Sequence, residues 1–159
     1  MAKRRGKLVL RQGKFLEAAR QQHRTSDAQQ STYGKYHNLE RIKDKLNYRY
    51  FDGELEVTIR WGQLPPPKQQ KRVSIRMGSC DVDKRRITIH PALDRVWVPK
   101  FFVEWIVYHE MLHVKIPPYR KKGRWQFHFP EFKAEETIFR YYRSAVRWEK
   151  RFLNRLLRF

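Results

Sequence analysis

The chain has 159 residues, of which 40% are hydrophobic and 14% aromatic, so a folded domain is expected and a wholly disordered chain is excluded. Its single cysteine, Cys80, excludes an internal disulfide, and no apolar run approaches the ~20 residues of a membrane-spanning helix. With no signal-peptide pattern at the start, these features predict a cytoplasmic protein, or one associated with a nucleoid or nucleus.

The net charge of +20 is concentrated towards the two ends of the chain. Residues 1–35 contain nine Lys or Arg against two acidic residues, and residues 140–159 contain seven against Glu149 alone. An excess of this size favours a polyanionic partner, most often nucleic acid, although a solubilising surface would also account for it. We expect residues 1–35 to form a basic extension or linker and the folded domain to begin at residue 36.

The residues that follow predict one helix and then short strands. Large apolar side chains recur at helical spacing at Leu39, Ile42, Leu46 and Tyr50, and the FDG triplet at 51–53 ends the helix. Three later segments alternate apolar and polar residues, as strands with one buried face do. These segments are residues 56–61, 72–78 and 86–90, with a turn predicted at 79–84.

A longer helix is predicted to begin near Pro99 and to end at the prolines 117–118. Its apolar residues recur at three- and four-residue spacing, and His109 and His113 lie on the same face. Proline favours the first turn of a helix and cannot continue one, so both ends are marked in the sequence.

The C-terminal segment is predicted as a loop at 119–129 followed by one long or broken helix at 131–159. Basic residues occupy one side of this helix within about 140°, and apolar residues occupy the other, with Glu149 as the odd member of the apolar side. The basic side suits a nucleic-acid backbone or an anionic membrane surface, but an ordinary solvated face has the same pattern. It consists of Arg140, Arg143, Arg147, Lys150, Arg151, Arg155 and Arg158.

The motif His109-Glu110-Met111-Leu112-His113 has the spacing of a zinc hydrolase site. Residues four apart lie one above the other on a helix, so both imidazoles can reach a single ion. The carboxylate of Glu110 would lie beside the open coordination position and act as general base on a zinc-activated water. A core helix could carry the same residues, but the shared apolar face and the proline-rich exit favour a metal. We therefore predict one zinc ion and Glu110 as the catalytic residue.

A catalytic zinc site takes a third protein ligand, and the chain offers few candidates. The histidines near the N-terminus lie in a polar segment, and His90 ends a predicted strand. His128 remains, at the start of the helix that follows the motif, together with the three glutamates Glu131, Glu135 and Glu136 on that helix, of which Glu131 or Glu135 could be the ligand. A glutamate ligand would make the protein a small gluzincin-like protease without a nucleic-acid role.

Several segments resemble the SprT-like metallopeptidases. Besides the HExxH helix, they are RYFDGELEVTIRWG (49–62), RMGSCD (76–81), ITIHPALD (87–94) and HFPEF (128–132). The resemblance covers about residues 36–140 and implies an α+β, zincin-like domain. In such a domain a short antiparallel or mixed sheet packs on the active-site helix. We expect the basic amphipathic helix at 141–159 to pack on this domain or to extend it.

The resemblance also implies the third ligand and the activity. The family's third zinc ligand is a histidine ahead of a Pro-Glu-Phe element, which corresponds to His128, although Phe129 replaces the glycine usual after it. The implied activity is zinc-dependent endoproteolysis of proteins at nucleic acid, with DNA, including single-stranded DNA, as the expected partner. An extended peptide would add to the edge of the strand at 72–78 or at 86–90.

The predicted loop at 119–129 interleaves cations with aromatic side chains. Such a pattern suits stacking on exposed bases and binding of phosphates, and it also suits an ordinary loop that covers a core. A nucleic-acid-binding protein with a catalytically idle metal site is the alternative from another functional class. The candidate contacts in the loop are Arg120, Lys121, Lys122, Arg124 and Trp125.

Overall fold

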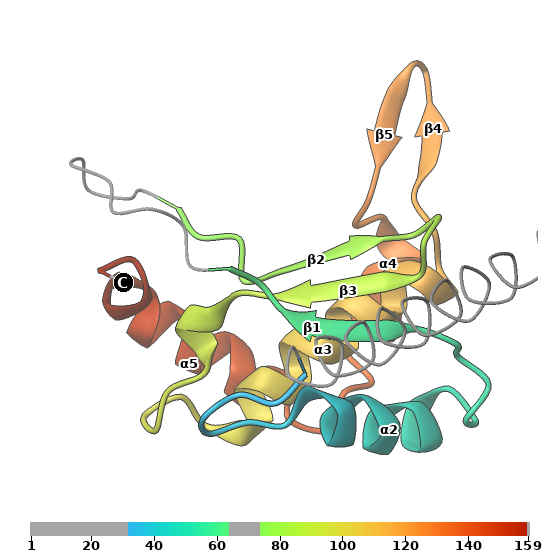
Figure 1. The fold of residues 1–159 in the computed structure, drawn as a ribbon. Coiled ribbons are helices and arrows are strands. Elements are labelled where there is room, and N and C mark those ends of the chain that lie inside the picture. The colour runs from blue at the N-terminus through green and yellow to red at the C-terminus, as the bar shows by residue number, and fades with distance from the viewer. Residues whose placement is uncertain (1–31, 64–73, 159) are drawn as a thin grey trace, which may run out of the picture. The chain divides into compact units, whose positions relative to one another are not determined.

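The computed structural model describes residues 32–63 and 74–158, and most of the predicted extension, residues 1–31, lies outside them. The described part is an α+β arrangement of four α-helices and two small sheets, which confirms the predicted fold class at this level (Figure 1). The helices are α2 (Leu39–Tyr50), α3 (Lys100–Lys115), α4 (Pro130–Glu136) and α5 (Tyr142–Leu156). The strands are β1 (Thr58–Trp61), β2 (Gly78–Asp81), β3 (Arg86–Ile89), β4 (Tyr119–Lys121) and β5 (Arg124–Gln126).

Helix α2 confirms the first predicted helix. The side chain of Asn38 caps it by accepting a hydrogen bond from the backbone N–H of Arg41 at 3.0 Å. Gly53, with a φ of 77°, takes the chain away from the helix in a conformation that favours glycine. The buried side of α2 faces α3 and carries the apolar residues expected from the periodicity, which are Leu39, Ile42 and Leu46.

Asp94 ties the start of the described chain to the loop after β3. Its carboxylate accepts hydrogen bonds from the backbone N–H groups of Lys35, Tyr36 and His37, the last two at 2.9 and 3.0 Å. A Cβ atom on Gly34 would lie 2.5 Å from this carboxylate, so a larger residue there would displace the Asp94 side chain from these contacts. These contacts begin ahead of the domain boundary predicted after residue 35.

The three-stranded sheet has the order β1–β3–β2, with β1 parallel and β2 antiparallel to the central strand. The strand predicted at 72–78 is wrong in position, because pairing begins at Gly78 and continues through Cys80, which lies opposite Ile87. Backbone pairing with β3 sets the position of a strand, and alternation of side chains alone does not reveal it. Of the two strands expected to receive a peptide, β3 is central, so β2 is the one at an edge of this sheet.

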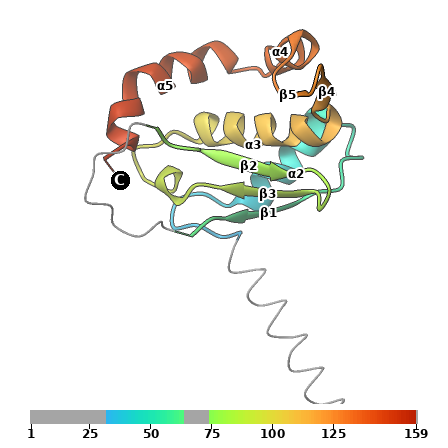
Figure 2. The same cartoon turned by 90° about the horizontal axis from the view of Figure 1, so that it is seen from above.

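Helix α3 lies at the centre of the described unit. It contacts α2, α4, α5, β2 and β3, and Figure 2 shows α5 running alongside it. The prediction of a single apolar face was too narrow, because the helix is buried on nearly every side. Even Glu104 is only 4% exposed, and its Oε1 accepts a hydrogen bond from Lys45 Nζ at 2.8 Å. The packing on all sides gives the motif histidines a rigid support.

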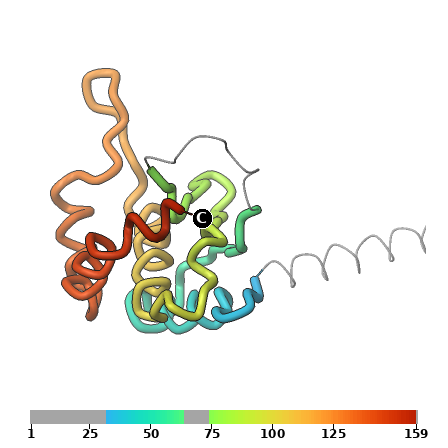
Figure 3. Tube along the Cα trace, turned by 90° about the vertical axis from the view of Figure 1, so that its left-hand side faces the viewer, coloured from blue at the N-terminus to red at the C-terminus, as the bar shows by residue number. Residues whose placement is uncertain are grey.

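Residues 119–126 form a β-hairpin, and the prediction of a loop was wrong. Strands β4 and β5 pair across a two-residue turn at Lys122 and Gly123, whose φ angles are 49° and 75°. Two successive positive φ angles match the twist of a hairpin. Because both short strands are almost wholly exposed, they lack the apolar alternation on which strand prediction depends. The hairpin projects from the rest of the unit (Figures 1 and 3).

The C-terminal segment forms the two helices α4 and α5, which is the broken form of the prediction. The end of α4 and the backbone after it are held against α3 and α2 by two tyrosines. Tyr108 Oη donates a hydrogen bond to the carbonyl oxygen of Glu135 at 2.9 Å, and the backbone N–H of Arg140 donates to Tyr50 Oη at 3.2 Å. Phe139, which is buried in the same place, stacks on Tyr108. These contacts end α4 and redirect the chain, so that α5 packs along α3.

Candidate metal centre

Three histidine side chains meet above α3. His109 and His113 lie one helical turn apart, and His128 reaches them from the segment between the hairpin and α4. The Nε2 atom of His128 lies 3.2 Å from Nε2 of His109 and 3.3 Å from Nε2 of His113. The three predicted ligands therefore converge within the distance range of a metal site.

The separation and the charge state of these nitrogens fit a zinc ion. Two ligands that each lie about 2.0 Å from zinc, at a tetrahedral angle, are about 3.3 Å apart. Burial lowers the pKa of His113 to about 4, and burial followed by the charge of His109 lowers the pKa of His128. Both rings are therefore neutral near pH 7 and can offer a lone pair, which is the form that binds a metal.

Glu136 orients the first of the three histidines. Its Oε1 atom lies 2.8 Å from His109 Nδ1, and both side chains are largely buried. A carboxylate in this position accepts the Nδ1 proton, so that the lone pair of Nε2 faces the other two rings. Sequence reasoning counted Glu136 among the available glutamates but did not predict its role beside His109, although a carboxylate partner for a ligating histidine is common.

The two glutamates weighed as third ligands lie elsewhere. The carboxylate of Glu135 pairs with Lys115 Nζ at 2.9 Å, and the side chain of Glu131 is exposed. Within residues 32–63 and 74–158, the side chains that are close enough to share an ion are those of the three histidines. The geometry therefore favours His128 over both glutamates.

Phe132 supports all three imidazoles from below. Its fully buried ring stacks on His113, with centroids 4.6 Å apart and planes at 28°, and meets His109 and His128 edge-on at 5.3 and 5.1 Å. The Nδ1 atom of His113 is buried and has no hydrogen-bond partner in the described part of the chain. Packing against Phe132 thus orients this ring in place of a hydrogen bond.

Glu110 faces the same space from α3. Its side chain is 7% exposed, and burial raises its pKa to about 7, while His109 and Arg76 act in the opposite direction. Gly78 at the start of β2 makes room for it, because a Cβ atom there would lie 2.5 Å from Glu110 Oε1. The edge strand and the predicted base are therefore in close contact, and the base is held at a pKa suited to exchanging protons near neutrality.

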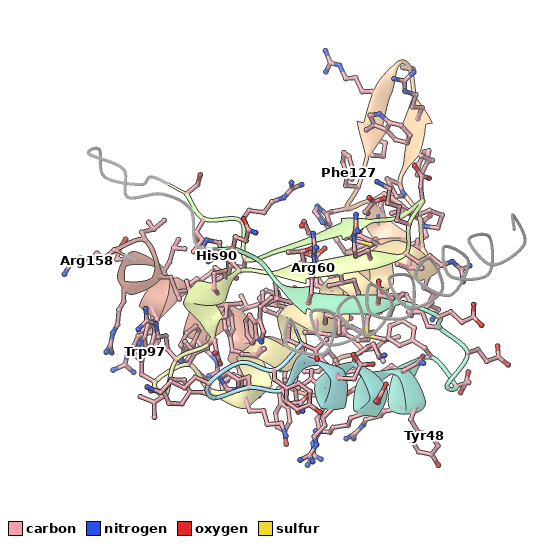
Figure 4. All side chains as sticks on the ribbon, viewed as in Figure 1. Tyr48, Arg60, His90, Trp97, Phe127 and Arg158 are labelled. Carbon is pink, nitrogen blue, oxygen red and sulfur yellow. The ribbon has the colours of Figure 1, made fainter. Side chains whose placement is uncertain are left out.

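A cavity of about 470 Å³ lies over these residues. The edge strand β2 and the residues before it form one wall, α3 contributes the floor, and α5 and the base of the hairpin complete the lining. Phe127, labelled in Figure 4, lies at the base of the hairpin. The lining includes several residues that sequence reasoning did not assign to the site, among them Arg76, Trp105, Phe127, Glu136 and Glu149.

The predicted nucleic-acid residues are exposed and fall into two groups. Those of the hairpin project with β4 and β5, where the guanidinium of Arg120 lies over the ring of Trp125 at 5.2 Å. Those of α5 and the residues just before it line the outer side of that helix, which ends near Arg158 and away from the hairpin (Figure 4). Arg155 in this group also stacks over Trp97 at 4.1 Å. The structure therefore does not join the two groups into one patch.

No helix in the described ranges combines the length and the apolar character needed to cross a membrane.

In comparisons with known proteins, the chain matches no family model, and no curated protein or solved structure matches it either.

Proposed function

We propose that this chain is a zinc-dependent endopeptidase, similar to the SprT-like enzymes, that acts on proteins at nucleic acid. The observation that carries the proposal is the meeting of three Nε2 atoms, 3.2 and 3.3 Å apart, in a cavity that also contains the buried carboxyl of Glu110. A closed structural zinc site has four protein ligands and no need of a base. Three ligands with an adjacent base are the arrangement of a hydrolytic site.

When bound, zinc would polarise the carbonyl of the substrate and lower the pKa of a water molecule towards about 7. His109, His113 and His128 would hold the ion through their Nε2 atoms, and Glu136 keeps the proton of His109 on Nδ1. Glu110 would take a proton from the attacking water on a carboxylate oxygen and pass it to the nitrogen of the leaving amine. In the metal-free protein burial raises the pKa of Glu110 to about 7, and a zinc ion beside it would favour the carboxylate form that accepts the proton.

The substrate path proposed here follows the edge of β2. This strand lines the cavity next to Glu110. The other edge strand of the sheet, β1, is separated from it by β3. An extended peptide could pair with the backbone of Gly78 to Asp81 and so present a carbonyl group to the metal centre. Unfolded or extended segments of proteins, rather than compact folded domains, would then be the substrates.

An unfolded protein such as casein provides the direct test. We expect the purified full chain loaded with zinc to cleave it, cleavage to stop on treatment with a zinc chelator, and cleavage to return when zinc is added back. Gel electrophoresis and mass spectrometry of the fragments are the measurements. Zinc-loaded protein that leaves casein and a range of unstructured peptides intact would exclude the protease function.

The proposed contact with nucleic acid is supported by the exposed hairpin. Its two strands and their turn contain four cations, Arg120, Lys121, Lys122 and Arg124, beside a tryptophan that is 52% exposed. Aromatic side chains next to cations stack on unpaired bases and contact phosphates. The SprT-like resemblance and the net charge of +20 point to the same class of partner.

Replacing Trp125 with alanine is expected to weaken binding of a single-stranded oligonucleotide by about 5- to 100-fold, because one stacking contact is lost. Fluorescence anisotropy of a labelled oligonucleotide at two salt concentrations measures the effect. The matched control is Tyr48→Ala, because Tyr48 is 84% exposed on α2, away from the hairpin (Figure 4). The Tyr48→Ala protein should bind the oligonucleotide like the wild type. Equal affinities for both variants and the wild type would exclude the hairpin as the contact.

A further inference from the structure

Glu149 is the one acidic residue of the basic helix α5, and it lies on the packed side of that helix. The structure gives a reason for its position, because Glu149 lines the cavity of the metal centre together with Trp105 and His109. Within residues 32–63 and 74–158, no hydrogen bond or ion pair reaches its carboxylate. A half-buried carboxylate without such a partner is unfavourable in the free protein and favours a ligand that can pair with it.

Glu149 has no direct ion pair in the described part of the chain, although His109 and Lys150 act on it from beyond ion-pair distance. Glu136 is bonded to His109, and Glu110 lies beside the three imidazoles, so these two carboxylates would balance the two charges of a zinc ion. Arg76, the cation of the opposite wall, acts on Glu110 and His113. The groups that act on Glu149 are His109, Glu136 and its neighbour Lys150.

We propose that Glu149 determines specificity by binding a positively charged group of the substrate, a lysine or arginine side chain next to the bond that is cleaved. This inference rests on the proposed protease function and adds the substrate preference. The carboxylate would make a charge-assisted hydrogen bond to the cation. The indole of Trp105, which lines the same cavity, would pack against the aliphatic stem of the side chain.

The position of this pair fits a residue that flanks the cleaved bond. Trp105 precedes His109 by one helical turn, which is about 5.4 Å along the helix axis. Successive residues of an extended peptide are about 3.3 Å apart. A side chain that reaches Trp105 and Glu149 therefore belongs to a residue within one or two positions of the carbonyl at the metal centre.

Cleavage of a matched peptide series tests this preference. The peptides of the main series are blocked at both ends. They differ at one position at a time, and that position carries lysine, arginine, neutral norleucine or glutamate. One further peptide has an unblocked N-terminus, and its free amine is its only cation. We expect kcat/KM for the best lysine or arginine peptide to exceed that for norleucine by about 10- to 100-fold. Preference for the free amine over every lysine and arginine peptide would overturn the side-chain role and indicate a site for the α-amine instead.

The variants connect the preference to Glu149. In Glu149→Gln the ratio of the two kcat/KM values should fall to near one, and in Glu149→Lys the glutamate peptide should become the better substrate. Glu131→Gln is the matched control, because Glu131 is exposed and outside the cavity, and it should keep the wild-type ratio. Equal cleavage of charged and neutral peptides by the wild type, or an unchanged ratio in Glu149→Gln, would overturn the proposal.

A binding measurement separates this inference from the proposed reaction. Isothermal titration of the lysine and norleucine peptides into the Glu110→Gln protein reports recognition without hydrolysis, and the double variant Glu110→Gln with Glu149→Gln reports the contribution of the carboxylate. Preferential binding of the lysine peptide that disappears in the double variant would support the cation site, even if the wild type cleaved nothing. Equal binding of the two peptides would reject it, even if the wild type were an active protease.

Discussion

Glu110→Gln is expected to lower the rate of peptide cleavage by about 100- to 10,000-fold, which is the contribution of a positioned general base. Glutamine has almost the shape of glutamate and fits the space beside Gly78, but it cannot accept and return a proton. Zinc should remain bound, since the three ligating histidines are unchanged. Steady-state cleavage of an unfolded protein, with the zinc content of each sample measured in parallel, determines both quantities.

The outcome that would contradict this role is a Glu110→Gln protein that holds zinc and cleaves at the wild-type rate. Such a result would place the base elsewhere in the cavity. A loss of activity accompanied by a loss of zinc would instead indicate that the substitution damaged the metal centre. The parallel metal measurement is therefore the control that makes the loss of activity interpretable.

The stability of the metal-free protein checks the environment of the same residue. Because the pKa of Glu110 is raised from 4.5 to about 7, the folded state favours the protonated carboxyl more than the unfolded state does. The wild type should therefore lose stability relative to Glu110→Gln as the pH rises from 4.5 to about 7, by about 3 kcal/mol in total. Chemical denaturation across this pH range measures the difference.

His128→Ala is expected to abolish stoichiometric zinc binding and, with it, cleavage. His128 is the one ligand that is not on α3, and its removal leaves two imidazoles on one helix, which is fewer than the three protein ligands of catalytic zinc sites. Elemental analysis of the purified variant, beside a competition titration with a zinc chelator, gives the stoichiometry and the affinity.

Two substitutions on α4 serve as controls for His128, and a third tests the partner of His109. Glu131→Ala and Glu135→Ala should keep one zinc per chain, since one side chain is exposed and the other pairs with Lys115. Glu136→Ala should retain the site but weaken zinc binding by about 10- to 100-fold, because the partner of His109 is lost. If Glu135→Ala lost its zinc while His128→Ala kept it, the third ligand would be a glutamate after all.

The parts of the fold that the sequence predicted well are those with strong local patterns. The helix at 39–50 and the long helix after Pro99 have regular apolar spacing and clear ends, and both are present. The motif histidines follow from helical geometry alone, since residues four apart share a face. The placement of His128 beside them required the resemblance to a known family, because nothing in its local sequence gives its distance from α3.

The parts that were missed depend on contacts between distant residues. The position of β2 follows from its pairing with β3, and the hairpin at 119–126 has strands too exposed to show alternation. Glu136 and Glu149 look like ordinary charged residues of amphipathic helices until the helices are packed around α3. The one local signal was Glu149 itself, an acid on the apolar side of a basic helix, and its meaning depended on knowing what that side faces.

Anomalous diffraction at the zinc absorption edge, from crystals of the zinc-loaded protein, would locate the ion that we assign to His109, His113 and His128. We predict a single strong peak about 2.0–2.1 Å from the Nε2 atom of each of the three imidazoles, with no glutamate oxygen at bonding distance. A peak ligated by Glu131 or Glu135, or three rings turned away from one another with zinc bound elsewhere, would contradict it.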